Sequence, residues 1–173
     1  MSSSHLTTTW VCVATEGETV DGRVIEPEWL KESAVNYDPS YYTALIWEDH
    51  KRSLANLGEV LAAKSETNNG LTKLYVKLRP TLKLIEYNKL GQKLFCSIEI
   101  EEDFQGKGVF YLSGIAVTDT PASVGTDRLR FSINKSYFSR GKSKVMRSRP
   151  IKIKLDDSMC ANNASWFSAI SSG

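Results

Sequence analysis

Apolar and polar residues alternate along this chain in short runs that are separated by turn residues, a pattern typical of β-strands. The run Asn68-Asn69-Gly70 predicts a tight hairpin turn, because Asn-Gly readily takes the positive φ angles that such a turn needs. The pattern predicts six strands, at residues 10–14, 44–47, 57–63, 71–78, 94–101 and 109–117.

Two short helices are also predicted. The first covers residues 27–37, since Pro27 is favoured in a first helical turn, and the second follows Pro80 and ends at Gly91. Strands therefore outnumber helices, which favours a mainly β protein with peripheral helices (α+β), built on a mostly antiparallel sheet or barrel. The residues expected on the apolar helix faces are Trp29, Leu30 and Val35, then Leu82, Ile85, Tyr87 and Leu90.

Length and composition predict one globular domain with two tails. The 173 residues suffice for a core without a disulfide or metal staple, and the formal charge of +2 does not demand an anionic partner. We expect a flexible tail over residues 1–9, a domain over residues 10–132 and a C-terminal tail over residues 133–173. The chain has no signal-peptide pattern and no run near the ~20 apolar residues of a spanning helix, so we expect no membrane partner and no export.

The C-terminal tail begins with a basic segment that contains no acidic residue between Asp127 and Asp156. Like charges in a block repel one another, so this segment predicts an extended, solvated and disordered arm. A nucleic-acid contact is the alternative, although Tyr137 and Phe138 are too few for a stacking platform. Its basic residues are Lys135, Arg140, Lys142, Lys144, Arg147, Arg149, Lys152 and Lys154.

Cofactor and metal signatures are missing from the sequence. Cys12, Cys96 and Cys160 are far apart and odd in number, which favours a reducing cytoplasm over a disulfide framework or a zinc site. The chain has no glycine-rich phosphate loop and no H-E-x-x-H motif, and the single histidine in the body of the chain argues against metal-assisted hydrolysis. We therefore expect no cofactor and no metal.

Strand alternation selects a serine as the candidate nucleophile. Successive side chains in a strand point to opposite faces, so Ser97 is expected on a more polar face and Cys96 in the core. Ser97 is thus preferred to its neighbour Cys96. The core face comprises Leu94, Cys96, Ile98 and Ile100, and the other face comprises Phe95, Ser97, Glu99 and Glu101.

His50 is the one histidine outside the N-terminal tail, and Asp21, His50 and Ser97 occur in an order compatible with nucleophilic hydrolysis. Each residue also has an ordinary structural role open to it. Asp21-Gly22 is a common turn pair, His50 can cap or pack at a strand end, and serine is common on the wet side of a strand. These residues alone do not decide between the roles.

Four longer motifs stand out: residues 16–25 (EGETVDGRVI), Glu48-Asp49-His50, residues 96–100 (CSIEI) and residues 111–126 (YLSGIAVTDTPASVGT). Together they resemble the GPO family of tailed-phage capsid scaffolding proteins, whose members are procapsid-maturation serine peptidases. The last run is similar to the family pattern Y-L-x-G-[LI]-A-V-T-D-x-P-A-S-x-G-T. The resemblance covers roughly residues 10–132 and identifies that span as a serine peptidase domain.

The resemblance implies a β-barrel like that of the herpesvirus assemblins and an Asp-His-Ser triad. Carried over by motif, Ser97 is the nucleophile, His50 the general base and then acid, and Asp21 the carboxylate that holds the imidazole. Asp49 is a rival for the carboxylate role. Ser113-Gly114 is a candidate oxyanion-hole region, and a glycine that lets two strands pack closely is the alternative explanation.

The implied substrates are the major capsid protein and other procapsid proteins, inside the assembling procapsid in the bacterial host cytoplasm. Self-cleavage and a homodimer are further expectations of the resemblance. Family members continue into a long helical scaffold, whereas residues 156–173 show no heptads. A non-catalytic capsid assembly or scaffolding module and a truncated prophage product are the alternative functions.

Overall fold

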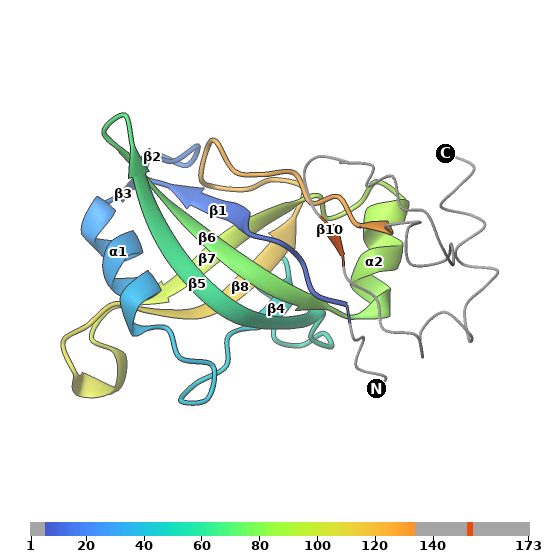
Figure 1. Ribbon diagram of the computed structural model, residues 1–173, viewed down its shortest axis with the longest axis horizontal. Helices are drawn as coiled ribbons and strands as arrows, with labels where there is room; N and C mark the ends of the chain where they lie inside the picture. Colours follow the sequence, from blue (N-terminus) through green and yellow to red (C-terminus); the bar gives the residue numbers. More distant parts are fainter. Residues whose placement is uncertain (1–5, 134–151, 154–173) are drawn as a thin grey trace, which may run out of the picture.

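A curved six-stranded sheet in the order β1-β6-β5-β4-β8-β7 forms the centre of the molecule (Figure 1). The computed structural model describes residues 6–133 and 152–153. The fold is mainly β with a few helices, as predicted. The strands of this sheet are β1 (Val11–Thr15), β4 (Leu45–Glu48), β5 (Gly58–Asn68), β6 (Leu71–Pro80), β7 (Phe95–Glu101) and β8 (Tyr111–Thr118).

Short elements surround the sheet. Helices α1 (Pro27–Asn36) and α2 (Leu82–Lys89) lie toward opposite ends of it in Figure 1. Two small pairs were not predicted: β2 (Gly17–Glu18) is antiparallel to β3 (Val24–Ile25), and β9 (Ser132–Ile133) is parallel to β10 (Lys152–Ile153). A 3-10 turn, η1 (Phe104–Gly106), lies between β7 and β8.

The predicted hairpin is confirmed. β5 and β6 are antiparallel, and their pairing extends from Asn68 opposite Leu71, at the turn, to Gly58 opposite Pro80. Both strands therefore run further than the apolar runs suggested. At the turn, Asn69 has φ 52° and Gly70 has φ 76°. These are the left-handed conformations for which Asn-Gly is favoured.

The predicted closed barrel is wrong, because β1 and β7 remain the two edges of an open sheet. An irregular segment joins these edges instead. The Asp127 N–H donates to the Cys12 carbonyl oxygen (2.9 Å), and the Leu129 N–H donates to the Leu94 carbonyl oxygen (2.6 Å). The sheet is also mixed, since β4 is antiparallel to β5 and parallel to β8.

Helix α1 packs against the sheet through Trp29 and Leu30, as predicted, but not through Val35. Leu30 and Ser33 are buried and Ala34 is partly buried against the core, whereas Val35 is 84% exposed. At 100° per residue, positions three and four after Leu30 return to its face, and position five does not. In α2, Ile85 is buried and Leu82 and Tyr87 pack against the core as predicted, whereas Leu90 at the C-cap is exposed and Leu84, which was not predicted, is buried.

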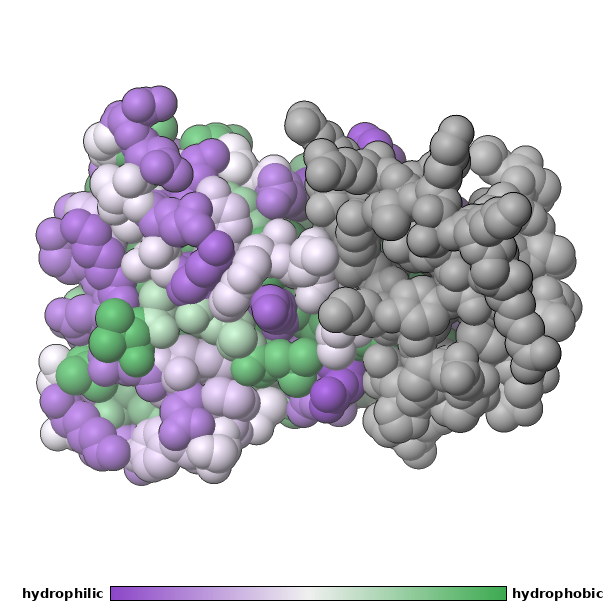
Figure 2. All heavy atoms as spheres, in the orientation of Figure 1, coloured by the Kyte–Doolittle hydropathy of each residue, from purple (hydrophilic) through white to green (hydrophobic). Residues whose placement is uncertain are grey.

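The face seen in Figure 2, over β5 and β6, is mostly hydrophilic or intermediate in hydropathy, with apolar residues in small separate groups. None of the helices in the described part of the chain is long and apolar enough to cross a membrane. In the predicted C-terminal tail the structure describes β10 and the end of β9. The other residues of the basic segment, and Cys160, lie outside the described residues.

Candidate active site

Three adjacent strands place Trp47, Ser97 and Glu99 on one face of the sheet. Ser97 of β7 is opposite Ala116 of β8, which is opposite Trp47 of β4. Two residues further along β7, Glu99 is opposite Gly114 of β8. Because side chains alternate with a period of two, Ser97 and Glu99 share a face and their positions are about 7 Å apart along β7.

Ser97 lies on the face opposite Cys96, as predicted, but that face is not open to water at this point. Ser97 is 9% exposed. Its hydroxyl forms no hydrogen bond with the residues that the structure describes, and it lies in the wall of a cavity of about 480 Å³. A sheltered hydroxyl without a hydrogen-bond partner beside a cavity is available to a ligand.

Cys96 is fully buried in the hydrophobic core. Burial, with the nearby Asp127, raises the pKa of its thiol to about 12. Since the thiolate is the nucleophilic form of cysteine, this thiol is inert at neutral pH. The geometry thus favours Ser97 over Cys96.

His50 lies in a tight turn that reverses the chain after β4. Asp49 and His50 both adopt left-handed conformations, with φ 46° and 61°. The Asp49 N–H donates to the Val117 carbonyl oxygen (3.1 Å), which ties the turn to β8. The chain then returns over the sheet, where the Arg52 guanidinium stacks on the Trp47 ring, 4.7 Å from its centroid.

Glu99 is the residue that joins this turn to β7. The His50 ring Nδ1–H donates to Glu99 Oε1 (2.6 Å), Arg52 Nη1 donates to the same oxygen (2.9 Å), and Arg52 Nη2 pairs with Oε2. Burial acts to raise the pKa of Glu99, but hydrogen bonds from Arg52 and His50 outweigh burial and lower that pKa. The carboxylate is therefore ionised near neutral pH.

The Glu99 contact selects one tautomer of the neutral His50 ring. An ionised carboxylate can only accept hydrogen bonds, so the shared proton must be on Nδ1. In the neutral ring Nε2 is then unprotonated, and it is the nitrogen able to accept a proton. The His50 side chain is 45% exposed, whereas the Glu99 side chain is 15% exposed, so the imidazole is more open to solvent than the carboxylate that holds it.

Gly114 provides the space that the Glu99 side chain occupies. A Cβ placed on Gly114 would collide with the Glu99 carboxylate and come within 3.3 Å of Arg52 Nη2. Gly114 thus permits a close approach, but what approaches its backbone is the Glu99 side chain and not a second strand. The Ser113 hydroxyl donates to the Glu99 carbonyl oxygen (3.2 Å), and a role of this region as an oxyanion hole stays a prediction.

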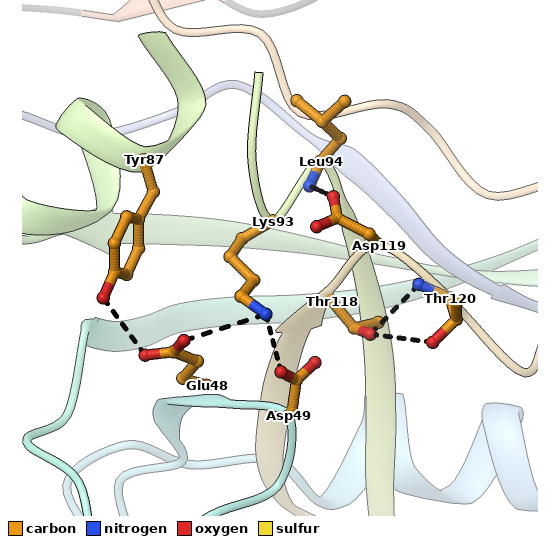
Figure 3. Close-up of polar contacts among 8 residues, drawn as sticks. All are labelled: Glu48, Asp49, Tyr87, Lys93, Leu94, Thr118, Asp119 and Thr120. Carbon is orange, nitrogen blue, oxygen red and sulfur yellow. Dashed lines mark hydrogen bonds and ion pairs between the residues drawn. The ribbon is translucent and has the colours of Figure 1, made fainter. Parts of the chain in front are cut away.

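Asp49, the rival carboxylate, points toward Lys93 in Figure 3. Lys93 Nζ donates to Asp49 Oδ2 (2.6 Å), and this hydrogen bond lowers the pKa of Asp49. Lys93 also pairs with Glu48 (3.7 Å), to which the Tyr87 hydroxyl donates (3.2 Å). Together these contacts clamp the turn that carries His50.

Asp21 lies in the exposed turn between β2 and β3. Hydrogen bonds from the Thr19 hydroxyl and from Arg23 Nε (2.9 Å) lower the pKa of its carboxyl group. Thr19 and Arg23 also line the cavity beside Ser97, so the Asp21 turn forms part of its rim. In the described part of the chain no hydrogen bond joins Asp21 to His50, and the Asp21-His50-Ser97 triad stays a prediction.

Two residues of this site, Glu99 and Arg52, were not identified as functional from the sequence. Strand alternation did place Glu99 on the face of Ser97, and that was the available signal. Nothing comparable marks Arg52, which reaches the site through the turn. No group of three or more His, Cys, Asp or Glu side chains that could hold a metal ion occurs among residues 6–133 and 152–153.

Comparisons with known proteins agree with the motifs. The family model described as "GPO serine peptidase, N-terminal domain" matches residues 8–134. The chain is 37% identical over 131 residues to a "Capsid assembly scaffolding protein" of Escherichia phage P2, a match that covers 69% of this chain and 46% of the relative. The chain thus spans about half the length of that curated relative. No solved structure matches the chain.

Proposed function

The chain belongs to the GPO serine peptidase family, and on that premise we propose that it is a serine endopeptidase that cleaves procapsid proteins during phage capsid assembly. The family and the name of the phage P2 relative support a role in capsid assembly. The proposed substrates are the major capsid protein and other procapsid proteins, cleaved within the assembling procapsid in the bacterial host. Self-cleavage, a homodimer and a likeness to the assemblin fold belong to the same proposal.

The hydrogen bond from His50 Nδ1 to Glu99 Oε1 carries this proposal. It supports the tautomer that a general base of a serine peptidase requires, with Nε2 free to accept a proton. The anchor, Glu99, is two residues along β7 from Ser97 and on the same face. The Ser97 and His50 side chains are not hydrogen-bonded to each other here, and catalytic hydrogen bonds commonly tighten when substrate binds.

In the proposed mechanism, Ser97 Oγ attacks the carbonyl carbon of the scissile peptide bond while His50 Nε2 takes the hydroxyl proton. The tetrahedral intermediate collapses when protonated His50 gives that proton to the leaving amine, which leaves an acyl-enzyme on Ser97. Water then attacks the ester, His50 again takes and returns the proton, and a carboxylic acid and the free Ser97 hydroxyl result.

A carboxylate stabilises the imidazolium in this mechanism, and two candidates are available. Asp21 has this role in the proposed triad, by its position in the family motif. Glu99 makes the contact with the ring in the structure. In the structure the Asp21 carboxylate accepts hydrogen bonds from Thr19 and Arg23 and none from His50.

A non-catalytic scaffolding module is the second candidate function, because the phage P2 relative carries the name of a scaffolding protein. The decisive experiment is co-expression of the full chain with the shell protein from the same phage or prophage, followed by mass analysis of the fragments. We expect trimming by the natural chain and by Cys96→Ala, and none by Ser97→Ala. Shell protein that is trimmed equally in the presence of Ser97→Ala would refute the peptidase function.

A further inference from the structure

The cavity beside Ser97 has apolar walls built from elements far apart in the sequence. Its volume of about 480 Å³ is within the range of ligand-binding clefts. Trp29 at the start of α1 and Phe110 before β8 stack with ring centroids 5.6 Å apart. The large apolar residues that line it are Val24, Ile25, Trp29, Ile98, Ile100 and Phe110.

The charges at this cavity favour an uncharged occupant. Its lining contains one cationic residue, Arg23, and one anionic residue, Glu102. Arg23 is already paired with Asp21 (2.8 Å). An anion placed between these apolar walls would lose hydration without gaining a free counter-charge, which is costly, and Glu102 is exposed to solvent rather than enclosed by these walls.

The cavity lies at the free edge of β7. Ser97 and Ile98 are consecutive and point to opposite faces of the strand, yet both line the cavity. A space that touches both faces must lie at the strand edge. β7 is the last strand of its sheet, and the irregular segment that joins the sheet edges is bonded at Leu94, ahead of Ser97. From Ser97 to Glu101 the outer backbone groups form no hydrogen bond with another described backbone group, so they are open to pairing with an added extended chain.

From these observations we infer that the cavity is a side-chain subsite for an extended peptide that pairs with the free edge of β7 and places a large apolar residue, such as phenylalanine or leucine, between Trp29 and Ile98. This inference rests on the proposed peptidase function, to which it adds the substrate class. A peptide strand bound along β7 carries its carbonyl groups past Ser97. The side chain in the cavity then fixes which carbonyl is presented to the Ser97 hydroxyl.

The first test measures binding without catalysis. The full chain with Ser97→Ala is titrated into two fluorescein-labelled octapeptides of alanine and serine, one of which has a central phenylalanine, and fluorescence polarisation is recorded. We expect the phenylalanine peptide to bind at least about tenfold more tightly, because its side chain is removed from water. Equal affinities would overturn the inference, whatever the catalytic activity proves to be.

A matched pair of variants locates the bound residue. Val24 lines the cavity and is 51% exposed, so Val24→Trp fills the cavity without disturbing the core. Val35 lies on α1 outside the cavity and is 84% exposed, so Val35→Trp is the control. We expect Val24→Trp to abolish the preference for phenylalanine and Val35→Trp to retain it, and a preference that survives Val24→Trp would place the peptide elsewhere and overturn the inference.

The second test separates failure of the subsite from failure of the function. A proteome-derived peptide library is digested with the natural chain, and the cleaved bonds are identified by mass spectrometry. We expect a large apolar residue at one fixed position relative to the cut, lost in Val24→Trp. Cleavage that depends on Ser97 but shows no such residue would overturn the subsite alone. Cleavage unaffected by Ser97→Ala would overturn the proposed function, and the binding test would still decide the subsite.

Discussion

His50 and Glu99 are joined by a hydrogen bond of 2.6 Å between Nδ1 and Oε1. It links a turn after β4 to β7, two strands away, across the space that Gly114 leaves open on β8. Arg52 donates to the same oxygen and also pairs with Oε2 of this carboxylate. The position and tautomer of the ring therefore depend on a carboxylate whose own position is fixed by Arg52 and Gly114.

Glu99→Gln tests this dependence. The amide keeps the size of the side chain but removes its charge, and it can present N–H to the ring and favour the wrong tautomer. We expect kcat/KM to fall about 10²- to 10⁴-fold, with an unchanged circular dichroism spectrum, because the orienting carboxylate of a serine peptidase contributes on that scale. Glu66→Gln, which removes an exposed carboxylate paired with Lys64, should leave kcat/KM unchanged.

Asp21→Asn is the companion measurement for the proposed triad. If Asp21 supplies the carboxylate during turnover, this variant should lose activity on the same scale as Glu99→Gln. Full activity in Asp21→Asn would remove Asp21 from the triad and assign the role to Glu99. Full activity in Glu99→Gln, with loss of activity in Asp21→Asn, would instead show that the contact between His50 and Glu99 exists in the free protein and has no role during turnover.

Acid should weaken the fold partly through Glu99. The pKa of Glu99 is lowered in the folded chain, so its contribution to stability is complete above the ordinary value of 4.5 and is lost as the pH falls through the lowered value. Urea unfolding across the acid range should therefore show that the free-energy gap between the natural chain and Glu99→Gln narrows below about pH 4.5. A gap that stays constant over that range would contradict the ion-pair network.

Gly114→Ala is expected to destabilise the chain because its methyl group enters the space of the Glu99 carboxylate. The overpacking cost is about 1–3 kcal/mol in the natural chain. In a Glu99→Ala background the collision is gone, and alanine should be neutral or stabilising, because glycine inside a strand costs about 0.5–1 kcal/mol relative to alanine. A double-mutant cycle measured by urea unfolding tests this, and equal costs in both backgrounds would refute the coupling.

Local patterns predicted the parts of the fold that depend on neighbours in the sequence. Asn69-Gly70 identified the hairpin, and the alternation in β7 separated buried Cys96 from Ser97 and put Glu99 on the Ser97 face. These features follow from the period of a strand and from the φ angles of a turn. They do not depend on which strands become neighbours in space.

Features that depend on distant pairing were missed. The parallel pairing of β4 with β8 places Trp47 opposite Ala116, which is itself opposite Ser97 on β7. No local sequence pattern encodes the pairing of β4 with β8. The reversal at Asp49 and His50 uses two left-handed residues, neither of them glycine, and is held in place by tertiary contacts with β8 and Lys93. Sequence alternation also could not show that residues 127–129 would join the sheet edges in place of barrel closure.

The Lys93 clamp on that reversal gives the last prediction. Lys93→Met removes the 2.6 Å contact that holds the His50 turn, Asp49→Asn removes the negative charge of that contact, and neither removes a group that touches the ring. We expect both to lower kcat/KM, by about 10- to 100-fold for Lys93→Met and by no more than that for Asp49→Asn, as a small misplacement of the base would do. Lys64→Met, which breaks an exposed ion pair on β5, is the control and should leave kcat/KM unchanged. If Asp49→Asn lost about 10⁴-fold while Lys93→Met stayed active, Asp49 would be the carboxylate of His50 and the clamp would be the wrong explanation.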